Sequence, residues 1–125
     1  MTSRQLSIRI ARICDEKKAE EILILDVRKL TFLTDFFIVA STRHERQSQA
    51  IAEEIRKTMK GIGVQELGQN ARKASQWVLQ DFGDVVIHLF KTDQREFYDI
   101  ENLWVDAPHI KWQLARRKAR PAKKA

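Results

Sequence analysis

Two β-prone segments joined by a glycine-centred turn constrain the fold of this chain most strongly. Residues 76–81 and 85–90 are rich in β-branched and aromatic side chains, and Phe82-Gly83-Asp84 between them is a hairpin signal. Side chains alternate along paired strands, so the hairpin has two faces. One face comprises Trp77, Leu79, Asp81, Val86, His88 and Phe90. The other comprises Val78, Gln80, Val85, Ile87 and Leu89. Both faces are largely apolar, so the hairpin requires cover on both sides.

The first forty residues predict one helix and two buried strands. Residues 3–19 carry apolar side chains at helical spacing beneath a basic outer face. Residues 22–27 and 36–40 are short, almost continuous apolar runs, which are typical of buried strands.

A second helix is expected after residue 42. Thr42 and Glu45 have the spacing of a capping box, and Gly61 with Gly63 should end the helix. The order helix, strand, strand, helix and hairpin predicts an α/β domain with a mixed sheet and helices packed on it.

The remaining segments give weaker signals. Residues 64–67 are a further candidate strand, and Thr92 can cap a short helix over residues 93–100. Leu103 and Trp104 are expected to pack back on the sheet. The apolar pattern then thins, and a frayed helical turn followed by a disordered tail is expected.

Charge is distributed unevenly along the 125 residues. Residues 108–125 hold seven Lys or Arg and no acid, so the net charge of +6 comes from this end, and the rest carries 16 bases against 17 acids. Residues 77–107 alone are net −5. We therefore expect one domain over residues 1–107 and a basic, disordered tail over residues 108–125.

Composition excludes several classes of protein. Cys14 is the only cysteine, so an intrachain disulfide and a multi-cysteine zinc site are excluded. No apolar run has the length of a membrane-spanning helix. The start of the chain is basic and amphipathic but runs directly into helix-like sequence, and we expect a mature bacterial cytoplasmic protein.

Catalytic signals are sparse. His88 would need a carboxylate to orient it as a base, and Asp81 lies on the same face, but a packed or surface-contact histidine is favoured. Asp81 with Asp84 could form a metal-binding pair, although aspartate in a hairpin turn is favoured for its local hydrogen bonds. No phosphate-cradling or nucleophile-elbow motif is present, so neither catalytic residues, a metal nor a cofactor is expected.

An acidic segment that is rich in aromatic residues favours protein binding. Trp and Tyr are frequent interface anchors, and an acidic rim steers a basic partner. The basic tail can also contact RNA phosphates without reading sequence.

Three blocks of sequence resemble the ribosomal silencing factor family, also called RsfS or Iojap-like. They are TDFFIVASTRHERQSQAIAEEI, WVLQDFGDVVIHLF and REFYDIENLWVDA, and the similarity spans residues 7–107. The resemblance implies a nucleotidyltransferase-like α/β fold without the catalytic residues. It further implies a non-enzymatic factor that binds the large ribosomal subunit at universal large-subunit protein fourteen. Such binding would block joining of the small subunit and repress translation when nutrients are short.

The resemblance also implies a homodimer off the ribosome and a set of partner-binding residues. This set comprises Trp77, Leu79, Asp81, His88, Phe97, Tyr98, Asp99 and Glu101. Arg43, His44 and Gln47 belong to a family motif and are expected to shape the start of the second helix. Two alternatives stay open: an RNA- or ribosome-binding assembly factor that acts through the basic tail, and a nucleotidyltransferase-like enzyme.

Overall fold

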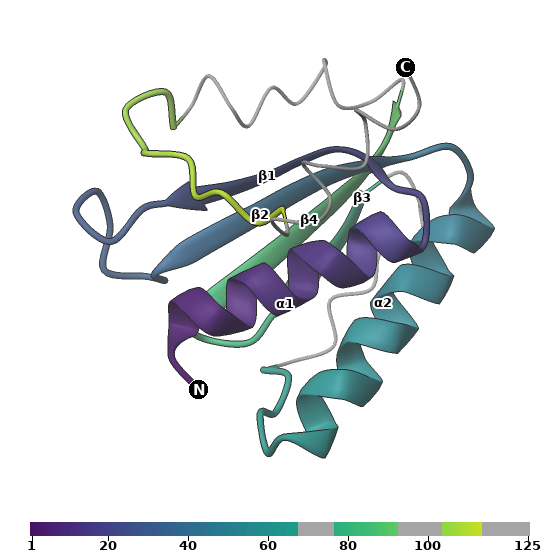
Figure 1. Cartoon of the computed structure of the whole chain (residues 1–125), viewed down its shortest axis with the longest axis horizontal. Helices are drawn as coiled ribbons and strands as arrows, with labels where there is room; N and C mark the ends of the chain where they lie inside the picture. Colours follow the sequence, from purple (N-terminus) through teal and green to yellow (C-terminus); the bar gives the residue numbers. More distant parts are fainter. Residues whose placement is uncertain (68–76, 93–103, 114–125) are drawn as a thin grey trace.

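The computed structural model describes residues 1–67, 77–92 and 104–113. Its elements are α1 (Ser3–Glu16), β1 (Glu20–Asp26), β2 (Phe36–Thr42), α2 (Glu45–Gly61), β3 (Trp77–Asp81) and β4 (Val85–Lys91). The strands form one sheet in the order β1-β2-β4-β3, in which only β2 and β4 are parallel. Both helices cover the same face of this sheet (Figure 1). The predicted α/β class with a mixed sheet is confirmed.

The first helix is shorter than the sequence pattern suggests. Thr2 caps α1 by accepting a hydrogen bond from the Gln5 amide at 3.1 Å, and the Gln5 side chain accepts one from the Thr2 amide at 2.9 Å. The helix ends at Glu16 instead of residue 19. Lys18 has a φ of 72°, a left-handed conformation that turns the chain out of the helix and into β1.

The predicted cap of α2 is wrong. Thr42 is the last residue of β2, pairs with Lys91 of β4 and shares a buried hydrogen bond with the Ser48 hydroxyl. His44 caps the helix instead, because its Nδ1 accepts a hydrogen bond from the Gln47 amide at 3.2 Å. The parallel pairing with β4 extends β2 through Thr42 and leaves that residue no freedom to act as a cap.

The main core lies between the helices and the sheet. Ile10 of α1, Ile55 of α2, Ile38 of β2 and Ile87 of β4 are fully buried there. Each such side chain contributes about 1.5–3 kcal/mol through burial. Gln80 of β3 is a buried polar residue on this side of the sheet, and its side-chain amide donates to the Ala52 carbonyl at 2.9 Å.

The hairpin has the predicted parity. Leu79 pairs with His88 and Asp81 with Val86 across β3 and β4. Gly83 has a φ of 87°, and its amide donates to Asp81 Oδ1 at 2.8 Å, so Asp81 supports the turn as expected. Residues 64–67 form no strand, which corrects that expectation; they contact β3 through the Leu67 amide, 2.7 Å from the Asp81 carbonyl oxygen.

Residues 108–113 run along the open edge of β1 (Figure 1). The Ile110 amide donates to the Ile24 carbonyl at 2.9 Å, and the indole N–H of Trp112 donates to the Ile22 carbonyl at 3.2 Å. Trp112 is 7% exposed. The expected helical turn is therefore wrong for residues 110–113, because these hydrogen bonds hold them in an extended conformation beside a strand. The predicted helix over 93–100, Leu103 and the rest of the tail lie outside the described residues.

Candidate partner-binding face

The sheet has a second face on which neither of the described helices, α1 and α2, packs. The register of the four strands puts one set of side chains there, which we call the helix-free face. Its members are Leu23, Leu25, Phe37, Val39, Leu79, Asp81, Val86, His88 and Phe90. This confirms that Leu79, Asp81 and His88 share one side of the sheet, as strand alternation predicted.

Aromatic rings form the centre of the helix-free face. The ring of Phe37 meets the rings of His88 and Trp104 edge to face, with centroids 5.1 Å apart in both pairs. His88 also stacks on Phe90 at 6.1 Å. Trp104 reaches this cluster from the segment that follows the hairpin, so its expected packing on the sheet is confirmed.

His88 is a packing residue of this face. It is 7% exposed, and burial lowers its pKa from 6.5 to about 4, so the ring is neutral at neutral pH. Its cross-strand partner is Leu79, whereas Asp81 pairs with Val86. The arrangement therefore fits the packed histidine that the sequence favoured better than a base oriented by a carboxylate.

Leu79 and Asp81 lie on β3, at one end of the strand order, and are partly exposed. The carboxylate of Asp81 holds the turn, and Asp84 uses its backbone carbonyl to accept from the Asp35 and Phe36 amides at 3.0 and 3.1 Å. Within the described ranges, no three His, Cys, Asp or Glu side chains converge as metal ligands would. The side chain of Asp81 thus has a structural use in the turn, whereas Asp84 contributes through its backbone.

Several predicted contact residues fall beyond the part of the chain that the structure describes. They are Phe97, Tyr98, Asp99 and Glu101. The backbone of Trp77 pairs with Phe90, which puts Trp77 in register with the helix-free face.

Sequence reasoning missed Phe37. The run FFIVA was read as a wholly buried strand, yet Phe36 lies in the main core and Phe37 is partly exposed on the opposite face. Strand alternation within this run could have identified Phe37, because the two neighbouring phenylalanines must point to opposite sides.

Two further observations restrict the chemistry. Burial raises the pKa of the Cys14 thiol to about 12, so the thiol stays protonated at neutral pH. Among the described residues, no helix is both long enough and apolar enough to span a membrane.

Comparison with known proteins agrees with this architecture. The sequence of residues 1–125 matches the family described as ribosomal silencing factor during starvation, RsfS. The ribosomal silencing factor RsfS of Bacillus subtilis is 41% identical over 98 residues, covering 78% of this chain and 83% of the relative. The RsfS of Halalkalibacterium halodurans is 36% identical over 110 residues, covering 88% of this chain and 94% of the relative. A crystal structure of a protein from Chromobacterium violaceum superposes with a TM-score of 0.80 at 34% identity, covering 92% of this chain and 93% of that one.

The fold is an α/β domain in which α1 and α2 cover one face of a mixed four-stranded sheet. The family match extends over the whole chain, beyond the residues 7–107 that carry the resemblance. The chain belongs to the ribosomal silencing factor family, RsfS.

Proposed function

We propose that this protein is a ribosomal silencing factor that binds the large ribosomal subunit at universal large-subunit protein fourteen. Bound there, it blocks joining of the small subunit and represses translation under nutrient limitation. The family match over residues 1–125 is the observation that carries this proposal. The protein would act while associated with the ribosome in the bacterial cytoplasm, and the free protein would form a homodimer.

The helix-free face supports the proposal physically. Phe37, Leu79 and Val86 are partly exposed around a buried aromatic centre, a combination of apolar anchors on a rigid sheet that suits a protein partner. Residues 77–107 carry a net charge of −5, which favours a basic partner for this part of the chain. Leu79 and Asp81 are proposed as contacts, and His88 as the residue that holds Phe37 in place. Trp77, Phe97, Tyr98, Asp99 and Glu101 complete the proposed contact set.

The protein acts by occupying a surface and not by catalysis in this proposal. Binding to one partner is sufficient to exclude another when the two surfaces overlap, so no reacting group is required. The turn role of the Asp81 carboxylate and the buried thiol of Cys14 are consistent with this view.

A subunit-joining assay tests the proposal. Purified large and small subunits are mixed with increasing protein, and whole ribosomes are separated on a sucrose gradient. The natural protein should reduce the whole-ribosome peak in proportion to the bound fraction. Undiminished assembly at saturating protein would overturn the proposal.

Variants of the helix-free face locate the contact. Leu79→Ala and Phe37→Ala should weaken binding to the large subunit by ~1–4 kcal/mol if they lie at the interface centre. Leu33→Ala is the matched control, because Leu33 is 88% exposed in the loop between β1 and β2. Equal binding by all three variants would contradict the placement of the interface, even if the natural protein blocks joining.

A further inference from the structure

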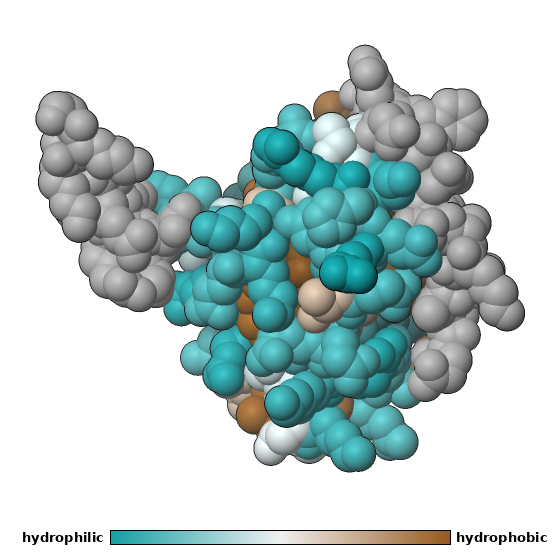
Figure 2. All heavy atoms as spheres, turned by 90° about the vertical axis from the view of Figure 1, so that its right-hand side faces the viewer, coloured by the Kyte–Doolittle hydropathy of each residue, from teal (hydrophilic) through white to brown (hydrophobic). Residues whose placement is uncertain are grey.

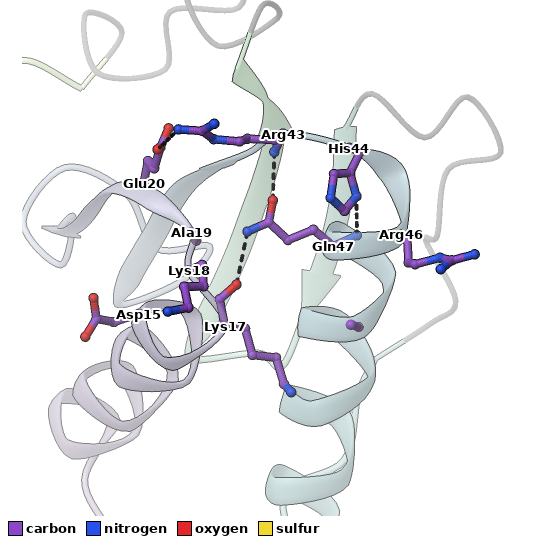
Figure 3. Close-up of a pocket in the computed structure, with 10 residues that line it drawn as sticks. Asp15, Lys17, Lys18, Ala19, Glu20, Arg43, His44, Arg46 and Gln47 are labelled. Atoms are coloured by element: carbon purple, nitrogen blue, oxygen red, sulfur yellow. Dashed lines mark hydrogen bonds and ion pairs between the residues drawn. The ribbon is translucent and has the colours of Figure 1, made fainter.

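A basic hollow lies where α1 ends and where β1 and α2 begin (Figure 3). Neither Leu79 nor Asp81 lines it. It has a volume of about 770 Å³. Its charged lining consists of Lys17, Lys18, Arg43, Arg46, Asp15 and Glu20. Four bases thus line one hollow and come from the end of α1, the segment after β2 and the first turn of α2.

A second hollow continues this surface. It has a volume of about 460 Å³, shares Glu20 and Arg43 with the first, and adds Lys91 and Thr92 at the end of β4. We call the two hollows together the basic groove. The groove carries five bases and two acids, which gives it a net charge of +3.

Most of this positive charge is not neutralised by neighbouring side chains. Glu20 is paired with Arg43 at 2.8 Å, and this pair is largely exposed. Among the described residues, Lys17, Lys18 and Arg46 form no ion pair. The side of the molecule on which α2 begins is mostly hydrophilic, with a few apolar atoms between the polar ones (Figure 2). Excess cationic charge on an open, polar surface attracts anions.

Gln47 holds the groove together. Its Oε1 accepts a hydrogen bond from the Arg43 amide at 2.7 Å, and its Nε2 donates to the Lys17 carbonyl at 3.0 Å (Figure 3). One side chain therefore links the end of α1, the residue after β2 and the first turn of α2. Thr92 Oγ1 donates to the Thr42 carbonyl at 2.9 Å and ties the ends of β4 and β2. The backbone that carries the bases is fixed by these bonds, as a binding surface requires.

The chemistry of the lining indicates the class of ligand. The bases are spread along the groove: Lys17 reaches between the two helices, whereas Arg46 points outward from α2 (Figure 3). Such a spread suits an extended polyanion better than a single small anion. In the described part of the chain, neither hollow is lined by Phe, Tyr or Trp, and the one ring in the lining, the imidazole of His44, is engaged through Nδ1 as the cap of α2, so stacking of bases is not the main interaction that this lining offers. Contacts to a phosphate backbone need no stacking and carry no sequence preference.

We propose that the basic groove binds the phosphodiester backbone of RNA. None of its described lining residues belongs to the helix-free face, so the proposal does not depend on the proposed function. Lys17, Arg46 and Lys91 supply phosphate contacts, and Gln47 positions the first of them.

Fluorescence anisotropy with a labelled polyuridine oligonucleotide tests this proposal on the full-length protein. The groove variant combines Lys17→Gln, Arg46→Gln and Lys91→Gln. The control variant removes the same charge elsewhere through Arg9→Gln, Lys29→Gln and Lys57→Gln, three exposed positions outside the groove. Both variants keep the tail intact and have the same net charge. Circular dichroism verifies that both retain the folded state.

The groove variant should bind RNA roughly tenfold more weakly than the control variant, or weaker still. The magnitude of the slope of log affinity against log salt should fall by about 2, because each of the three lost phosphate contacts contributes about 0.7 on a single strand. A variant with Lys17→Arg and Lys91→Arg should bind as the natural protein does. Equal affinities of the groove and control variants would overturn the proposal, since net charge or the tail would then account for binding. Displacement of the RNA by inorganic phosphate beyond the effect of chloride at equal ionic strength would overturn it as well, in favour of a small-anion site.

Discussion

Acid should destabilise this protein through His88. The ring is 7% exposed and lies against Phe37 and Phe90, and burial lowers its pKa from 6.5 to about 4. The folded state therefore binds the proton more weakly than the unfolded state does. Between these two pKa values the unfolded chain carries more protons, so the free energy of unfolding must fall as the pH is lowered from 6.5 toward 4.

The size of this effect follows from the two pKa values. The loss should reach about 2 kcal/mol by pH 5 and about 3 kcal/mol by pH 4. This is a large part of a typical stability of about 5–15 kcal/mol. Asp26 acts in a lower window, because its hydrogen bonds with Arg28 lower its pKa below 3.8 and its contribution is lost only as the pH falls through that range. Measurements above pH 4.5 are therefore dominated by His88 among the shifted groups described here.

Urea unfolding followed by circular dichroism, from about pH 7.5 to about pH 4.5, measures the effect. His88→Gln should be less stable than the natural protein at neutral pH, because the ring contacts are lost. That deficit should shrink by about 2.5 kcal/mol across the range, since the variant has no buried imidazole to protonate. His109→Gln, at an exposed position, is the matched control for loss of a histidine. Parallel curves for the natural protein and His88→Gln would refute the reasoning.

Three further outcomes are expected. Trp112→Ala should lower the free energy of unfolding by about 3–5 kcal/mol in urea denaturation, since it removes a buried indole and its hydrogen bond to Ile22; an unchanged midpoint would contradict the packing of residues 108–113. Phe32→Ser should change the free energy of unfolding by less than about 0.5 kcal/mol in the same assay, because Phe32 is fully exposed, and a larger loss would show an unrecognised contact. Cys14 should resist iodoacetamide in the folded protein and react in urea, as mass spectrometry would report; rapid labelling of the folded state would contradict its burial.

Local sequence signals were sufficient for the type and order of most elements. The turn and the alternation of side chains predicted which residues of the hairpin share a face, and they placed Leu79 and His88 on the same one. Boundaries were harder to predict. The end of α1 depends on the left-handed conformation of Lys18, and lysine rarely adopts that conformation, so its presence does not predict the end of a helix. The cap of α2 moved from Thr42 to His44 because β2 gains a parallel partner, β4, that lies more than forty residues further along the chain.

The same limit applies to the surfaces. Alternation predicts which residues share a face, but not which face the helices cover, since both were apolar enough to be buried. The position of Trp112 could not be predicted either. The apolar residues around it are too few to predict a helix or strand, and its segment is held in place by hydrogen bonds to the backbone of β1. The basic groove was likewise hidden, because Lys17, Arg46 and Lys91 are far apart in sequence and meet only through the sheet topology.

The two proposed surfaces can act at the same time because β4 separates their charges. Asp81 pairs with Val86 near the start of β4, whereas Lys91 ends that strand at the groove. A strand of this length spans roughly 20 Å, which exceeds the Debye length of about 8 Å at physiological salt. A partner close to the start of β4 would therefore meet the negative charge of Asp81, and a partner close to its end would meet the positive charge of Lys91. A large ribosomal subunit presents both basic protein and RNA phosphate, so a domain with this polarity would be oriented by the two attractions together. If both proposals hold, loss of the groove should slow and misorient docking, whereas loss of Leu79 should chiefly shorten the lifetime of the docked state.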